Sequence, residues 1–567
     1  MNSRPTLEWP VRWMLFCAVL LWAAFLLPNH YPPWTSFHGS AMAAVAFIPI
    51  GIWAALRGAP GVPGPVLLLW SMAAVPPAQW MAGLVSYRGD ATVAMTYLLG
   101  AGSVCWAGAS CRAVTNRAMS DARKSVSNDP AIFLAAALAL AAIASFGMAV
   151  HQWLNLRLLG VLIEELPPGG RPYANLGQPN HLATLALMGL GGLLYLFERR
   201  SIGGAAVSSG VMVCLLTAVM TQSRTVALAG IGVLIFAWIK RRCVANRVRW
   251  MHVAGALLFY GLLISGWDRI QDALLIGGTP SVLDRTQENL RLALWHMELD
   301  AIGHAFWGGY GWNQAGMGQW VVALEHPSLR YFFDSAHNLI LDLVLWNGVP
   351  IGLAFSLALA YFVWRIMVKI RDPGDFWLAA ILIFVGSHAL VEYPLSYAYF
   401  LLPSCFIIGY LVVGVDGASF FGRANTREIF FRISVTLVTT ALAILIIVDY
   451  IPWEAEWQKL RYEEQRIGTS SQAPLPRAVV LDQLQEFMEF SRAEASPGMS
   501  TSYIDWMHRV TVRYPYPASI FKYAKALYLN GQAGLAEEQL ERLCRMALPK
   551  KCEQARSEWA SVVKEAR

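Results

Sequence analysis

Residues 131–150 read AIFLAAALALAAIASFGMAV, twenty consecutive residues without a charged side chain. A helix needs about 20 predominantly apolar residues to cross the hydrocarbon core of a bilayer. Similar blocks recur along the chain, and only 14% of its 567 residues are charged. Soluble domains carry about 25% charged residues. The sequence therefore predicts a polytopic membrane protein.

Thirteen such blocks predict about thirteen transmembrane helices in an all-α fold. They lie at residues 11–27, 41–57, 63–83, 91–111, 130–150, 180–197, 203–221, 225–240, 251–267, 337–364, 375–392, 396–414 and 430–449. The block at 11–27 has no small-residue cleavage site after it, so it is interpreted as a span and not as a signal peptide.

Basic residues predict the orientation, because cytoplasmic loops of membrane proteins carry an excess of Lys and Arg. With the N-terminus in the cytoplasm, the inner segments hold 20 of the 44 basic residues and the outer loops between spans hold 8. The net charge of +7 is therefore attributed to topology and not to nucleic-acid binding. An odd number of spans then places the C-terminus outside.

The predicted transmembrane domain covers residues 1–449, and residues 450–567 form a small helical domain on the outer face. A long outer loop spans 268–336, with a helical pattern near 285–306. Within the outer domain, residues 518–548 predict a helical hairpin that resembles one tetratricopeptide unit, although a simple helical cap explains it as well.

Cys544 and Cys552 are the two cysteines in a polar region, so a disulfide is predicted between them in an oxidising compartment. The other six cysteines are interpreted as small buried side chains. No CxxC pair is present, so no zinc site is predicted.

Polar side chains gather where an outer loop enters the span at 180–197. Arg171 and the run Gln178-Pro179-Asn180-His181 lie there, and Pro179 suits the first turn of a helix. Such residues can simply mark the membrane interface. Several hydrogen-bonding groups at one helix mouth also fit a polar ligand.

Two further arginines lie in outer segments. Arg224 stands in a short turn between two spans, where it either snorkels to the interface or pairs with an anion. Arg291 lies on the amphipathic pattern of the long loop. It either forms a surface salt bridge with Glu288 or Glu298, or clamps a phosphate with its two parallel donors.

His337 opens the predicted span at 337–364, directly after the long loop. Histidine is the usual side chain for proton transfer near neutral pH. Asp334, Asn338 and Asp342 surround it in the sequence. A lone interfacial histidine is often structural, but these neighbours favour a functional role.

His388 and Glu392 occupy the short outer turn between the spans at 375–392 and 396–414. Their spacing of four places them on one helical face, where they could pair and close the helix end. Tyr393, with Tyr397 and Tyr399, either belongs to an interfacial aromatic belt or contacts a ligand. All these groups fall on the predicted outer face, which suits a substrate with a lipid tail, a pyrophosphate and a sugar.

Several motifs resemble bacterial protein O-oligosaccharyltransferases of the PglL type, also called pilin glycosylases. These motifs are residues 28–37 (PNHYPPWTSF), 171–184 with Gln178-Pro179-Asn180-His181, 221–225 (TQSRT) and 391–400 (VEYPLSYAYF). His337-Asn338 followed by Gly348 resembles a motif shared more widely with O-antigen ligases and polymerases.

The resemblance implies a GT-C-like membrane glycosyltransferase of the bacterial inner membrane. Its donor would be an undecaprenyl-pyrophosphate-linked oligosaccharide, and its acceptor a Ser or Thr of pilin or another periplasmic protein. Neither a metal nor a cofactor is expected. Membrane lipids would surround the chain, and no nucleic acid would bind.

The resemblance also implies roles for the residues singled out above. His337, Gln178 and Tyr393 would be essential, with Glu392, Asp334 and Asp342 as further possible bases. The remaining candidates would bind pyrophosphate (Arg224, Arg291 and Arg171) and the sugar or acceptor (Asn180, His181, Asn338 and His388). Whether His337 activates the acceptor hydroxyl or steadies the leaving group is left open.

Three other functions compete with protein glycosylation. An O-antigen ligase would use lipid A–core as acceptor, and an O-antigen polymerase would extend the glycan itself. A transporter or lipid flippase is disfavoured, because transporters place their polar residues near the bilayer midplane.

Overall fold

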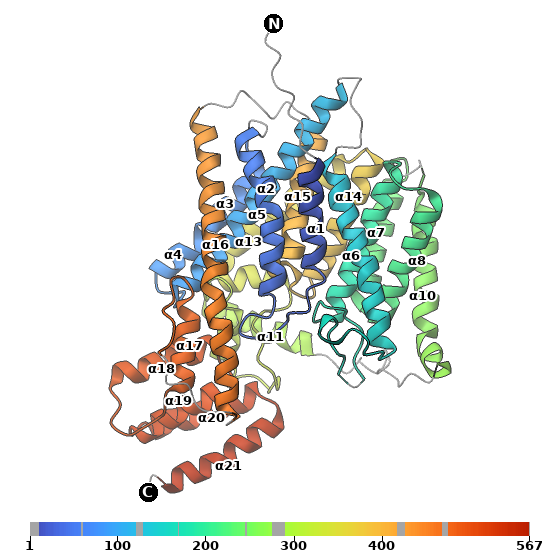
Figure 1. Ribbon diagram of the computed structural model, residues 1–567. Helices are drawn as coiled ribbons and strands as arrows, with labels where there is room; N and C mark the ends of the chain where they lie inside the picture. The colour runs from blue at the N-terminus through green and yellow to red at the C-terminus, as the bar shows by residue number, and fades with distance from the viewer. Residues whose placement is uncertain are drawn as a thin grey trace. The chain divides into compact units, whose positions relative to one another are not determined.

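A computed structural model describes residues 11–57, 61–120, 129–167, 169–243, 247–274, 290–416, 426–465, 467 and 474–565. Regular structure within these ranges is helical (Figure 1). The α-helices are α1 (Val11–Ala24), α2 (Phe37–Arg57), α3 (Gly64–Ala73), α4 (Val75–Met81), α5 (Arg88–Ser120), α6 (Pro130–Trp153), α7 (Pro179–Glu198), α8 (Gly204–Thr221), α9 (Arg224–Ile239), α10 (Trp250–Ala273), α11 (Leu290–His304), α12 (Ala315–Val322), α13 (Leu339–Lys369), α14 (Pro373–Ala389), α15 (Ala398–Asp416), α16 (Thr426–Glu464), α17 (Asp482–Arg492), α18 (Thr501–Arg513), α19 (Pro517–Leu529), α20 (Ala533–Met546) and α21 (Pro549–Glu565). Two short 3₁₀ helices, η2 (Gly160–Leu162) and η4 (Pro394–Ser396), lie in connecting segments.

Nine helices in the described residues are long and apolar enough to cross a membrane: α2, α5, α6, α7, α8, α10, α13, α15 and α16. Three shorter apolar helices are α1, α9 and α14. The chain is therefore a multi-pass, all-helical membrane protein.

The segment 63–83 differs from its prediction as a single span. It is interrupted at Ala74 between α3 and α4, where Pro76 and Pro77 follow and lack the N–H groups that would continue the helix. The prediction rested on the apolar composition averaged over the whole segment, and such an average does not show where a helix breaks.

The described residues divide into two compact units. The first lies within Met1–Ser71, Tyr97–Gln287 and Ala358–Ala443, and the second within Met72–Thr96, Glu288–Leu357 and Ile444–Arg567. This division differs from the predicted boundary at residue 449, because the C-terminal helices share their unit with part of the long loop.

The core of the first unit surrounds α7, which packs against α6, α8 and α14 (Figure 1). Small side chains allow close approach of these helices: a Cβ added at Gly192 would lie 2.6 Å from the carbonyl oxygen of Ala135. Small residues at helix contacts are the usual means of packing in membranes, where the hydrophobic effect does not drive association.

An ionic network joins the C-terminal end of α7, the end opposite Gln178, to neighbouring helices. Arg199 donates to Asp372 and Asp375, and Arg112 of α5 donates to both oxygens of Asp375 at 2.8–3.1 Å. Tyr410 of α15 donates to Asp129 at 2.6 Å. The charged side chains of this network are paired, and together with Tyr410 they join five helices, α5, α6, α7, α14 and α15.

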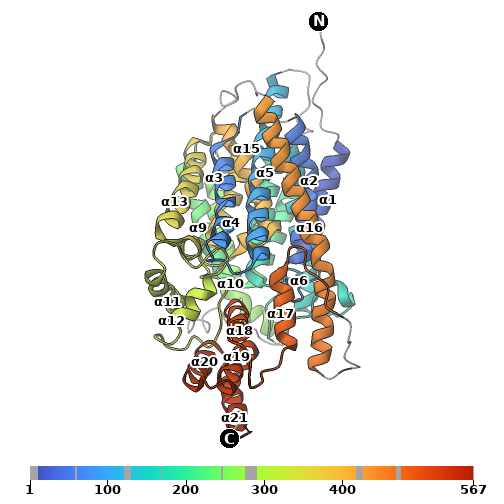
Figure 2. The same cartoon turned by 90° about the vertical axis from the view of Figure 1, so that its left-hand side faces the viewer.

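The second unit contains the five C-terminal helices, α17–α21. Consecutive members pack together, and α18, α19 and α20 lie side by side (Figure 2). The predicted hairpin is confirmed as α19 and α20, joined at Asn530–Gln532. The predicted disulfide is also confirmed, because Cys544 of α20 is bonded to Cys552 of α21.

A break in α13 is the point at which the long loop hydrogen-bonds to this helix within the second unit. Gly348 has φ 75° and ψ 167°, which interrupts the helix. There Val349 N–H donates to Phe306 O, and Tyr310 N–H donates to Leu345 O. A side chain at Gly348 would lie 2.5 Å from the main chain of Trp307, so only glycine fits this crossing.

The predicted helix of the long loop is α11. Residues 285–289 at the start of the predicted pattern, with Glu288, lie outside the described residues.

Candidate active site

One group of candidate residues lies in the first unit, and we call it the helix-mouth cluster. It consists of Gln178, Asn180, His181, Thr184, Ser223, His388, Glu392, Tyr393 and Tyr397. Three separate segments contribute: the start of α7, the turn before α9, and the connection from α14 to α15.

Asn180 joins these three segments through its side-chain amide. Its Nδ2 donates to Glu392 Oε1 at 3.1 Å, and its Oδ1 accepts from the Ser223 hydroxyl at 2.8 Å. Glu392 is only 2% exposed. The structure therefore shows Asn180 and Glu392 holding the cluster together, which favours positioning over direct proton transfer.

Two buried histidines form the floor of the cluster. His388 Nδ1 lies 2.6 Å from the Thr184 hydroxyl, and the His181 ring lies 4.4 Å from Tyr397 in an edge-to-face contact. Their residue exposures are 0% and 1%. Because Tyr397 stacks on Tyr393 at 6.1 Å, His181 supports the half-buried Tyr393 ring through Tyr397, and the His388 ring packs against His181 at 5.7 Å.

Gln178 stands at the N-terminal end of α7, one residue before Pro179. Gln178 has an extended backbone (φ −149°) and is the last residue of the loop between α6 and α7. Its main-chain oxygen accepts a hydrogen bond from His181 N–H. Its side-chain Oε1 is buried and has no hydrogen-bond partner in the part of the chain that the structure describes. An acceptor left in this state is suited to a hydroxyl of a bound sugar.

Arg171 contacts the turn that precedes α9, and Arg224 follows this turn directly. Arg171 Nη1 donates to the carbonyl oxygen of Thr221 at 3.0 Å, and Gln222 adopts a left-handed conformation (φ 48°). Arg224 is the first residue of α9 and is exposed. A helix N-terminus beside two guanidinium groups favours an anionic ligand.

His337 belongs to the second unit, in a turn formed by Asp334–Asn338. It is half-buried and left-handed, with φ 51°. Asn338 ends this turn by accepting from the N–H groups of Ile340 and Leu341, which begins α13. A left-handed non-glycine residue costs about 1–3 kcal/mol and persists when its surroundings impose it.

Asp342 imposes this conformation from one turn inside α13. Its Oδ1 accepts from Ala336 N–H at 2.8 Å, and its Oδ2 accepts from the Ser335 hydroxyl at 2.7 Å. The Ser335 oxygen in turn accepts from His337 N–H at 3.0 Å. Asp342 is only 3% exposed, so the geometry makes it a positioning group for His337.

Glu298 of α11 is fully buried near Asp342. Neither of its carboxylate oxygens has a hydrogen-bond partner among the described residues. Burial raises the pKa of Glu298 well above its ordinary value of 4.5, and the Asp342 charge raises it further. Within the described residues, Glu298 does not form the surface salt bridge with Arg291 that was one prediction.

Arg291 and Asp334 are exposed residues of the second unit. Arg291 lies in the first turn of α11, and Asp334 opens the His337 turn. His337, Asn338 and Asp342 also lie in the second unit, whereas the remaining candidates, including Gln178, Tyr393 and His388, lie in the first unit. The structure thus gathers the predicted residues into two groups, one in each unit.

Comparison with known families covers both groups. Residues 172–197 match the family described as protein glycosylation ligase, and residues 207–356 match the O-antigen ligase family. Residues 376–561 match the C-terminal part of a virulence-factor membrane-bound polymerase family.

Two curated relatives come from Acinetobacter baylyi. A general O-oligosaccharyltransferase is 27% identical over 94% of this chain and 92% of its own length. A ComP-specific O-oligosaccharyltransferase is 34% identical over 47% of this chain and 48% of its own length. The chain is therefore similar to the O-antigen ligase family and, among curated proteins, to O-oligosaccharyltransferases.

The matched regions contain residues described above. The protein glycosylation ligase match holds Gln178 and Asn180, and the O-antigen ligase match holds Arg224, Arg291 and His337.

Sequence reasoning missed the residues that order the loop between α6 and α7. Gln152 Oε1 accepts from the N–H groups of Tyr173 and Ala174. Asn175 Oδ1 accepts from Glu164 N–H, and its main-chain oxygen lies 2.6 Å from His30 Nε2. Asn175 was visible inside the 171–184 motif, but its partners are distant in sequence.

Glu164 is a titratable group of this loop whose pKa is shifted. Burial raises the pKa of its carboxyl to about 7, although a hydrogen bond from Tyr173 opposes that rise.

Proposed function

We propose that this protein transfers a complete oligosaccharide from undecaprenyl pyrophosphate to a Ser or Thr hydroxyl of a periplasmic or secreted protein. The observation that carries this proposal is the match of 172–197 to protein glycosylation ligases, because this segment builds the start of α7 with Gln178 and Asn180. Similarity to a general O-oligosaccharyltransferase over 94% of the chain supports the same acceptor class.

In the proposed reaction, the acceptor oxygen attacks the anomeric carbon of the glycan, with inversion. The bond from that carbon to the pyrophosphate oxygen breaks, and undecaprenyl pyrophosphate leaves. His337 accepts the hydroxyl proton or stabilises the leaving group, which its half-buried position permits. No step in this scheme uses a metal or another cofactor.

The other residues hold the substrates. Arg171, Arg224 and Arg291 bind the pyrophosphate, whose geometry suits guanidinium groups. Gln178 and Tyr393 contact the sugar through an amide acceptor and an aromatic face. Asn180, His181, His388 and Glu392 keep those two residues in place, and Asn338 supports the His337 turn. Asp334 stays a possible base because it is exposed.

The proposed location is the bacterial inner membrane, with thirteen spans, a cytoplasmic N-terminus and a periplasmic C-terminus. In this arrangement, the interrupted segment of α3 and α4 counts as one span of the 1–449 transmembrane domain. The long loop and residues 450–567 then face the periplasm, where secreted acceptors are available. The disulfide Cys544–Cys552 fits that oxidising compartment.

A second candidate is transfer to lipid A–core, because residues 207–356 match the O-antigen ligase family. Expression with a lipid-linked glycan pathway, a candidate acceptor protein and intact lipid A–core separates the two. Mass spectrometry should find the glycan on the protein and not on the lipid. Transfer to lipid A–core alone would assign the protein as a ligase.

A further inference from the structure

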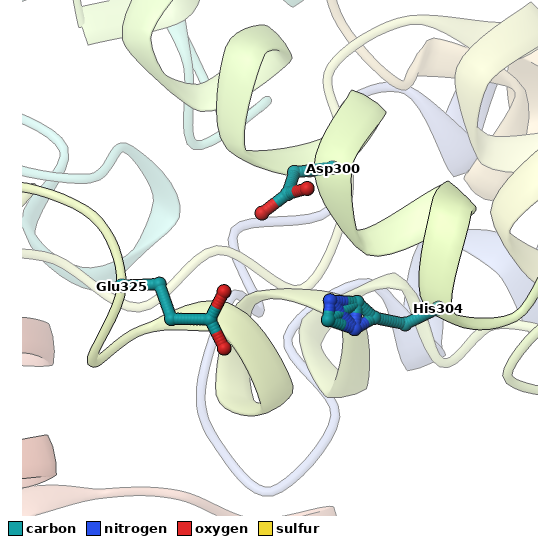
Figure 3. Close-up of side chains that lie close together, drawn as sticks. All are labelled: Asp300, His304 and Glu325. Atoms are coloured by element: carbon teal, nitrogen blue, oxygen red, sulfur yellow. The ribbon is translucent and has the colours of Figure 1, made fainter.

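Three metal-ligating side chains, Asp300, His304 and Glu325, converge on the long loop. One ligand atom of each lies within 4.8 Å of the other two. Asp300 and His304 are four residues apart on α11, so they share a face, and Glu325 reaches them from the segment after α12 (Figure 3). All three are exposed, which leaves the space between them open to ions from solution.

The charge of this group favours a cation. Two carboxylates this close repel each other unless positive charge lies beside them. Within the described residues, the basic partner is His326, whose Nε2 lies 3.0 Å from Asp300 Oδ2. One imidazole carries at most a single positive charge, so it does not fully offset two carboxylates.

The two ligand-bearing segments are already held by other contacts. Arg545 of α20 donates to the main-chain oxygen of His326 at 3.3 Å, and the Ser328 hydroxyl donates to Arg545 O at 2.8 Å. Tyr310 donates to Ala301 O on α11 at 2.7 Å. Because these contacts already hold the two segments, binding an ion would lose little conformational entropy.

We propose that Asp300, His304 and Glu325 bind one zinc ion that fastens α11 to the segment after α12. One imidazole and two carboxylates suit zinc, whereas calcium and magnesium prefer oxygen ligands alone. His326 orients Asp300 as an outer hydrogen-bond partner. This site is independent of glycan transfer, and its role is to stabilise the loop that carries Arg291 and leads to His337.

The test uses full-length protein in detergent, purified with a histidine-free tag and stripped with EDTA. After equilibration with ZnCl₂, elemental mass spectrometry should find about one zinc per chain, and the melting temperature should rise because zinc binds the folded state. His304→Ala and Asp300→Asn should lose this zinc. His326→Ala should weaken binding by about 10–100-fold.

His296→Ala is the matched control, because His296 is also exposed on α11 but lies outside the cluster. It should bind zinc and gain thermal stability as the wild type does. Equal zinc binding by wild type and His304→Ala would overturn the proposal. So would stabilisation by CaCl₂ without stabilisation by ZnCl₂. Elution of the variants at the wild-type volume in size-exclusion chromatography shows that they are folded.

Discussion

Asp342 differs from the other acidic residues near His337, because both of its carboxylate oxygens already accept hydrogen bonds. A general base must reach the proton that it removes. Asp342 points into its own turn and is buried, so it cannot serve that purpose without breaking the turn. Its contribution is to hold Ser335 and Ala336, and through them the left-handed backbone of His337.

We therefore expect Asp342→Asn to lower kcat of glycan transfer and leave KM for the donor nearly unchanged. An amide presents an N–H₂ group where an oxygen now accepts, and the lost hydrogen bond to a charged group corresponds to about 1.5–3 kcal/mol. That energy is about a 10–100-fold loss in rate if it acts on the transition state alone. Steady-state kinetics with purified lipid-linked glycan measures it.

Ser335→Ala should give a smaller loss of the same kind, because it removes the link between Asp342 and His337 N–H. Ser356→Ala is the control, since Ser356 lies on the same helix and donates only to Gly352 O. A wild-type kcat for Asp342→Asn would show that this contact does not position His337.

At the scale of elements, the break in α13 is a feature that should be sensitive to substitution. Gly348→Ala would place a Cβ 2.5 Å from the Trp307 main chain and would hold a non-glycine residue at φ 75°. We expect a loss of about 1–3 kcal/mol in unfolding free energy, seen as a lower melting temperature by tryptophan fluorescence. Gly261→Ala on α10 meets open space and should melt as the wild type does.

We expect the free energy of unfolding to depend on pH through Glu164, which lies in the loop between α6 and α7. Its folded pKa is raised from 4.5 to about 7. The folded state therefore binds the proton more tightly, and the stabilisation is complete below pH 4.5. It is lost as pH rises through about 7.

Glu164→Gln should remove this dependence, because glutamine does not titrate. Between about pH 5 and pH 8, a range that includes the folded-state pKa of Glu164 of about 7, its melting temperature should change less than that of the wild type. Glu165→Gln alters the exposed neighbour and should keep the wild-type profile. Parallel profiles for wild type and Glu164→Gln would contradict the account of this loop.

Much of the helical arrangement follows from the sequence, because a block of about twenty apolar residues has few alternatives to a spanning helix. The two prolines after Ala74 were also visible, but average hydropathy does not record where a helix breaks. The burial of Glu298 could not be predicted from the sequence, because a carboxylate on a helix such as α11 is usually exposed at the surface.

The candidate site shows the same limit. Gln178 and His337 were found from local motifs, and their backbone roles at the starts of α7 and α13 agree with their positions in the sequence. The link from Asn180 to Ser223 and Glu392 joins residues that are 43 and 212 positions apart. Such contacts depend on tertiary packing, which one sequence does not specify.

At the scale of the whole molecule, each compact unit is assembled from three separate stretches of the chain. The first unit contains the helix-mouth cluster, and the second contains the His337 turn, Arg291 and the C-terminal helices. If both groups serve one reaction, substitutions in either unit should stop transfer without preventing membrane insertion.

The most direct test of the proposed function is transfer in a purified system of this protein, undecaprenyl-pyrophosphate-linked glycan, an acceptor pilin and lipid A–core. Intact-mass spectrometry should show the pilin gaining the mass of the whole glycan. His337→Ala, inserted and folded, should slow this gain by about 10²–10⁴-fold. Pilin left unmodified by the wild type, while lipid A–core accepts the glycan, would contradict the proposal. Wild-type transfer by His337→Ala would contradict the mechanism.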